Sequence, residues 1–120
     1  MNFNIVDIMD RGIPNKERLV LKALVNFNLS YCLILNSRYI SSSRISNSPK
    51  GSFWFSPKDV KAGDLVIVYS GVGVSSEVKN QDGSTSHFFY WGSSSTLWND
   101  PNDCAVIFDV QTWQTTKYLS

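Results

Sequence analysis

The only histidine of this 120-residue chain, His87, begins a stretch rich in aromatic and hydroxyl side chains, HFFYWGSSSTLWNDPND, over residues 87–103. An imidazole close to a serine is the pair that a nucleophilic hydrolase needs. Ser84 and Ser86 are near in sequence, but adjacent strand residues point to opposite faces and no Gly-x-Ser-x-Gly nucleophile elbow is present. A structural or surface histidine is therefore the simpler interpretation, and a small hydrolase using His87 is kept as an alternative function.

The aromatic residues that follow the histidine divide between two faces. On a strand, Phe88 and Tyr90 lie on one side, and Phe89 and Trp91 lie on the other. One face can enter the core. The other must be covered by a loop, such as residues 36–51, or presented to a partner, since exposed aromatic surface is typical of interfaces. Burial of one face and coverage of the other by a loop need no binding partner. The pattern therefore favours strand ends and turns over a dedicated recognition site.

Two other segments resemble ligand sites only in part. Carboxylate and amide oxygens that could bind calcium crowd the turn at Asn99, Asp100, Asn102 and Asp103. These residues lack the central glycine and the later glutamate of an EF-hand, and a proline-containing turn explains them more simply. GVG at 71–73 lacks the further glycine and the Gly-Lys-Ser/Thr of a phosphate loop. With a single histidine as well, the sequence predicts no metal site and no cofactor.

One loop carries local positive charge. Residues 36–51 contain Arg38, Tyr39, Arg44 and Lys50 without an acid, and basic side chains beside an aromatic ring can grip phosphates and stack a base. The whole chain, however, has 11 Lys+Arg against 10 Asp+Glu, a formal charge of +1, so no global field favours nucleic acid or an anionic membrane. Nucleic acid is therefore not the expected partner, and Arg38, Tyr39 and Arg44 are candidates for contacting a protein.

The bulk composition predicts one folded domain over residues 1–120. The chain is 42% hydrophobic and 13% aromatic, which suits a packed globule. No apolar run is long enough to cross a membrane, and the first residues do not form a signal peptide. Two cysteines, Cys32 and Cys104, fit a reduced protein better than a disulfide framework, so we expect a cytoplasmic location, with a single bridge left open.

Short apolar runs bounded by turn residues predict five strands, at residues 29–36, 52–55, 65–69, 87–91 and 104–110. The run at 65–69 follows the turn KAGD and scarcely alternates, so we expect it to be buried on both faces. In the strand at 29–36, the face with more apolar side chains is expected to point inward. That face carries Leu29, Tyr31, Leu33 and Leu35. The connecting segments at 36–51 and 71–86 are expected to be solvated, mobile loops.

Residues 13–28 fit two periods. Val20, Leu21, Leu24 and Val25 recur at helical spacing, but the same stretch also alternates as a strand would. The five other strands favour the strand. Together these elements predict an all-β fold, an antiparallel β-sandwich in preference to a small barrel.

The order of these segments resembles the lamin-tail domain, an immunoglobulin-like β-sandwich. The likeness is carried by ERLVLKALVNFNLSYCLIL, FWFSPKDVKAGDLVIVYSG and HFFYWGSSSTLWNDPNDCAVIFD, which span about residues 17–110. Two positions depart from that family: Tyr31 stands where Gly-Trp usually follows Leu-Ser, and Asn102 stands where a glycine usually precedes Asp103. The resemblance implies an interaction module with no shared catalytic residues.

We therefore expect a non-catalytic module that binds another protein through an aromatic patch and end loops. The candidate binding residues are Tyr90, Trp91, Trp98, Arg38, Tyr39 and Arg44. A carbohydrate-binding sandwich, stacking a glycan on Trp91, Trp98 or Trp113, is the first alternative, and the hydrolase is the second. Self-association through an exposed edge strand is a further alternative for the partner.

Overall fold

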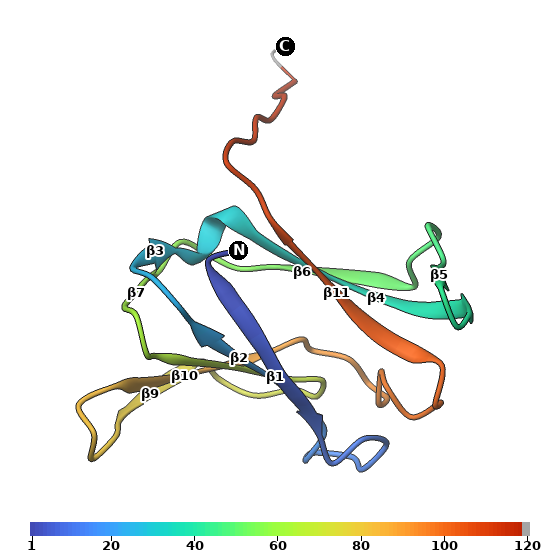
Figure 1. Ribbon diagram of the computed structural model, residues 1–120, viewed down its shortest axis with the longest axis horizontal. Coiled ribbons are helices and arrows are strands. Elements are labelled where there is room, and N and C mark those ends of the chain that lie inside the picture. Colours follow the sequence, from blue (N-terminus) through green and yellow to red (C-terminus); the bar gives the residue numbers. More distant parts are fainter. Residues whose placement is uncertain (119–120) are drawn as a thin grey trace.

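Two β-sheets face each other in the computed structural model, which describes residues 1–118 (Figure 1). The five-stranded sheet has the order β1 (Phe3–Met9), β2 (Arg18–Ala23), β8 (Leu65–Tyr69), β10 (Thr85–Tyr90), β9 (Ser76–Lys79). The opposite sheet, called here the β4 sheet, contains β11 (Asp103–Asp109), β4 (Cys32–Ser41), β6 (Gly51–Trp54) and, at one end, β5 (Arg44–Ile45). A small pair, β3 (Phe27–Asn28) with β7 (Asp59–Val60), and a 3-10 turn, η1 (Leu29–Tyr31), connect the layers. The predicted all-β fold is confirmed.

The core lies between the sheets because alternate residues of each strand point inward. Leu19 and Leu21 of β2 pair with Val68 and Val66 of β8, and each of these four side chains is at most 1% exposed. On the other face of β8, Ile67 is 9% exposed, whereas Leu65 and Tyr69 are half-buried, so burial on both faces is confirmed at the centre of the strand only. All strand pairs are antiparallel except β8 with β10, which is parallel.

Strand β4 presents the opposite face to the core from the one predicted. Cys32 and Ile34 are buried, whereas Leu33 and Leu35 are half-buried and face away from the core. The residues before β4 do not continue the strand, because the Asn28 side chain accepts a hydrogen bond from Ser30 N (2.9 Å) and stabilises η1. The alternation therefore starts afresh at residue 32. Leu29 is buried as predicted, but Tyr31 is exposed and Leu33 and Leu35 point outward.

Residues 13–28 form strands β2 and β3 after a turn, so the strand interpretation is confirmed and the helical one is wrong. Strand β1 was not among the predicted elements. The segment 71–86, predicted as a loop, contains β9, and the segment 36–51 contains the hairpin arm that ends β4 and forms β5.

A buried acid, Glu17, joins two loops at one end of the sandwich. Its carboxylate accepts hydrogen bonds from Gly12 N (2.7 Å), Leu97 N (2.6 Å) and Trp98 N (3.1 Å), and the residue has no exposed surface. Three charge-assisted bonds satisfy the carboxylate away from water. Glu17 thereby fixes the segment that carries Trp98 into the core.

Candidate functional site

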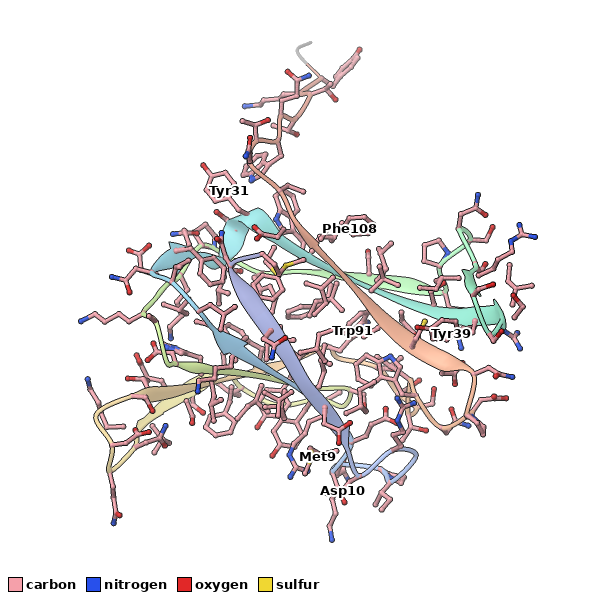
Figure 2. All side chains as sticks on the ribbon, in the orientation of Figure 1. Met9, Asp10, Tyr31, Tyr39, Trp91 and Phe108 are labelled. Atoms are coloured by element: carbon pink, nitrogen blue, oxygen red, sulfur yellow. The ribbon has the colours of Figure 1, made fainter. Side chains whose placement is uncertain are left out.

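The tryptophans of the 87–103 stretch lie between the sheets. Trp98 is fully buried and contacts Trp91 edge-on, with ring centroids 5.9 Å apart. Trp91 is half-buried and also packs on Phe53 at 5.4 Å, and Figure 2 shows its position between the layers. The expectation that Trp91 and Trp98 belong to a surface patch does not fit this packing, because their aromatic area is used to fill the core.

Tyr90 lies on the outer face of the five-stranded sheet, where it is already covered. Its ring stacks on Tyr69 with centroids 5.3 Å apart. The segment containing Gly73 passes over it so closely that a Cβ on Gly73 would lie 2.4 Å from the ring. The prediction that a loop covers this aromatic face holds, but the loop is the one after β8 and not the segment 36–51 that was given as an example.

Arg38, Tyr39 and Arg44 lie on the β4–β5 hairpin, and all three are exposed. This hairpin projects from one end of the β4 sheet (Figures 1 and 2). Part of the local positive charge is neutralised, since Lys50 Nζ lies 2.6 Å from Asp103 Oδ1. The structure thus places the predicted basic residues on a different sheet from Tyr90.

The outer face of the β4 sheet is an apolar surface that the sequence interpretation did not assign. In the strand register, Leu33 lies between Trp54 of β6 and Phe108 of β11, and Leu35 lies between Ser52 and Val106. Trp54 is 53% exposed and Phe108 is 43% exposed. We call this surface the β4 outer face, and its members, none of them charged, are Leu33, Leu35, Ser52, Trp54, Cys104, Val106 and Phe108.

An aromatic groove of about 300 Å³ continues the β4 outer face at one end. Its walls come from Tyr31 of η1, Trp54 of β6 and Trp113 of the segment after β11. Trp113 packs edge-on against Trp54, with centroids 4.8 Å apart, and Trp54 Nε1 donates a hydrogen bond to Ser30 O (2.8 Å). Figure 2 shows Tyr31 and Phe108 on the side of the β4 sheet that faces away from the core. The fixed Trp54 ring makes the groove a preformed feature.

A second cleft surrounds His87, which is buried next to Asp64. His87 Nε2 lies 2.9 Å from Asp64 Oδ2, and the same carboxylate accepts hydrogen bonds from Lys61 N and Thr85 N, both at 3.0 Å. Desolvation raises the pKa of Asp64, but these hydrogen bonds outweigh it and hold that pKa below its ordinary value. The Asp64 carboxylate thus holds the His87 ring through Nε2 and leaves Nδ1 on the other side of the ring.

The serines near His87 are engaged elsewhere. Ser86, on the opposite face of β10, donates to Asn80 Oδ1 (3.3 Å), and Ser84 Oγ donates to Asp82 Oδ1 (2.6 Å). Within residues 1–118, no serine hydroxyl is hydrogen-bonded to the imidazole of His87. The arrangement thus lacks the bonded nucleophile and base that the hydrolase alternative requires.

The oxygen-rich turn before β11 uses its side chains to bind its own backbone. Asp103 Oδ2 accepts a hydrogen bond from Asp100 N (3.0 Å), and Asp100 Oδ1 accepts one from Asn102 N (2.9 Å). These contacts support the turn interpretation over a calcium loop. Across the part of the chain that the structure describes, no group of three or more His, Cys, Asp or Glu side chains is arranged to hold a metal ion.

Cys32 and Cys104 are both free. On the β4–β11 ladder Cys32 pairs with Asp109 and Cys104 pairs with Ser37, so the two thiols lie at opposite ends of the strand pair. Burial, with the nearby Asp109 charge, raises the pKa of the Cys32 thiol to about 12. A disulfide within one chain is therefore excluded by this fold.

No family model, no curated protein and no solved structure matches this chain. Within residues 1–118, none of the helical structure has the length and apolar character needed to cross a membrane. Function is therefore inferred from the two surfaces described above, the β4 outer face and the cleft at His87.

Proposed function

We propose that this protein is a non-catalytic interaction module that binds another protein through the β4 outer face and the adjoining aromatic groove. The observation that carries the proposal is a sheet face without a charged side chain, on which Trp54 and Phe108 stay about half exposed. Soluble proteins rarely leave a large contiguous apolar patch bare, and interface cores are depleted in charge and enriched in aromatic residues. Trp54, Phe108 and Trp113 are the expected anchors.

A protein partner fits this surface better than a glycan does. A sugar site combines an aromatic platform with hydrogen-bond donors and acceptors for the hydroxyl groups. The indole N–H of Trp54 is already bonded to Ser30 O, and the members of the β4 outer face offer few polar groups. Three tryptophans were considered for stacking a sugar, and among the described residues only Trp113 of these is strongly exposed. Its ring already packs against the ring of Trp54.

The finer fold assignment belongs to the same proposal. Two facing, mainly antiparallel sheets support an immunoglobulin-like sandwich of the lamin-tail kind, a family that supplies interaction modules. The engaged hydroxyls of Ser84 and Ser86 support the absence of a hydrolase activity. The two free cysteines support a reducing compartment such as the cytoplasm.

The test compares matched surface variants in affinity capture and quantitative binding. Trp54→Gln with Phe108→Ser changes the β4 outer face, and Val78→Ser, at a residue 54% exposed on β9, is the control. Each truncated anchor is expected to weaken binding of the captured partner by ~30-fold or more, about 2 kcal/mol, whereas the control binds as the unchanged protein does. Sedimentation of the protein alone shows beforehand whether the partner is a second copy.

A partner that binds the double variant as tightly as the unchanged protein would overturn the proposal. Inhibition of capture by a free oligosaccharide would replace it with the carbohydrate alternative.

A further inference from the structure

The cleft at His87 lies on the other sheet from the β4 outer face and is independent of protein binding there. It has a volume of about 570 Å³ and is bordered by the turns before β8 and between β9 and β10. His87 lines it and is only 3% exposed. The ring is held by Asp64, yet its second nitrogen, Nδ1, has no hydrogen-bond partner. A buried polar atom without a partner calls for an explanation, and a bound ion is one of them.

The strand register explains which group faces this nitrogen. His87 of β10 lies directly opposite Glu77 of β9, so the two side chains share one face of the sheet. Glu77 Oε2 lies 3.9 Å from His87 Nδ1, whereas its other oxygen, Oε1, pairs with Lys58 Nζ at 3.6 Å. Because Nε2 is bonded to the Asp64 carboxylate, Nδ1 is the ring nitrogen left to bind a ligand. Nδ1 and a carboxylate oxygen therefore lie near each other on one face of the sheet.

We propose that His87 Nδ1 and Glu77 bind a divalent transition-metal ion such as Zn²⁺ or Cu²⁺, with water completing the coordination. Imidazole nitrogen and carboxylate oxygen are ligands of these ions, and hard ions such as Mg²⁺ prefer all-oxygen sites. The Asp64–His87 contact supplies the carboxylate that normally orients a metal-binding histidine from its far nitrogen. The site has two protein ligands, and within residues 1–118 no third His, Cys, Asp or Glu side chain completes it.

Nδ1 has no solvent-accessible surface as the side chains lie, so Glu77 must move to admit an ion. With metal–ligand distances of about 2.0–2.1 Å and a tetrahedral angle, the two ligand atoms lie ~3.3 Å apart. Glu77 Oε2 must therefore approach the ring by ~0.6 Å from its position at 3.9 Å. Glu77 is 57% exposed and belongs to an edge strand, so this shift breaks no buried contact, and the ion enters from the solvent side of Glu77. Lys58 competes for the same carboxylate and limits the affinity.

The test uses the fact that the chain has one histidine. Untagged protein is titrated with Cu²⁺, and pulsed electron paramagnetic resonance is used to detect coupling to a remote imidazole nitrogen, which can come only from His87. Zn²⁺ is then titrated by calorimetry and by ¹⁵N spectra of the ring. We expect imidazole coupling at one equivalent of Cu²⁺, a shift of the Nδ1 resonance with Zn²⁺, and loss of both in His87→Gln.

Variants separate a metal site from a structural histidine. Glu77→Gln is expected to weaken binding ~10-fold or more, and Asp64→Asn by 10–100-fold, the usual effect of removing a group that orients a ligand. Asp82→Asn, an exposed acid lining the same cleft, serves as the control and is expected to bind normally. Circular dichroism checks that each variant folds. If Asp64→Asn unfolds, the affinity of Glu77→Gln for the metal still tests the proposal. Binding without imidazole coupling, or binding unchanged in Glu77→Gln, would overturn the proposal.

Discussion

The outer faces of the two sheets differ in charge although both lie on the outside of the sandwich. The five-stranded sheet presents Asp7, Arg18 and Lys22 beside its apolar residues, and Arg18 lies over the Tyr69 ring at 5.8 Å. The β4 outer face has no charged residue, and its rings are partly bare. Charged side chains keep the first face compatible with water. The second face lacks this protection, which is why we assign binding to it.

The largest expected effect separates aromatic residues of the core from those of the β4 outer face. Trp98→Ala should lower the free energy of unfolding by about 3–5 kcal/mol, because it removes a fully buried ring and leaves a cavity. Trp54→Ala should lower it by about 1 kcal/mol, since half of that side chain is already exposed. Urea denaturation of both variants measures the difference. Equal losses would mean that the β4 outer face is part of the fold's own core.

A second prediction introduces the charge that the β4 outer face lacks. Leu35→Lys and Val20→Lys place a lysine on a half-buried, outward position of a central strand in each sheet. Both should cost about 1 kcal/mol of stability. Only Leu35→Lys should weaken binding of the captured partner, by ~30-fold or more, because a lysine there is buried on association. Calorimetric titration of the two variants compares the faces directly, and an equal effect of both would remove the distinction between them.

The strands could be predicted because their signals are local. The apolar run at 65–69 follows a turn whose Gly63 has a φ of +93°, which a glycine adopts without strain. The inward face of β4 could not be predicted in this way. It follows from η1, which the Asn28 side chain stabilises and which interrupts the alternation before residue 32.

The residues of the two candidate sites were missed for related reasons. Glu77 lies on β9, where the sequence SEVK has no apolar run and was interpreted as a loop. Asp64 was assigned to a turn, and the turn is what brings it to His87 on a strand 23 residues away. Tyr31 and Trp113 belong to segments without a strand pattern, so only the folded chain reveals that they border Trp54.

The smallest effect concerns the charged end of the β4 sheet, where Asp103 is buried against Lys50. Desolvation raises the pKa of Asp103, but the hydrogen bonds from Lys50 and Asp100 N outweigh it and lower that pKa. A carboxyl group with a lowered folded-state pKa stabilises the fold above its unfolded pKa of about 3.9, and this contribution disappears as the pH falls through the folded value. Asp103→Asn should therefore cost about 1 kcal/mol at pH 7 and progressively less below pH ~4, as urea denaturation at several pH values would measure. A loss of unfolding free energy that does not change with pH would show that Asp103 acts through its shape in the turn and not through its charge. The β4 outer face would then be independent of the ion pair at its end.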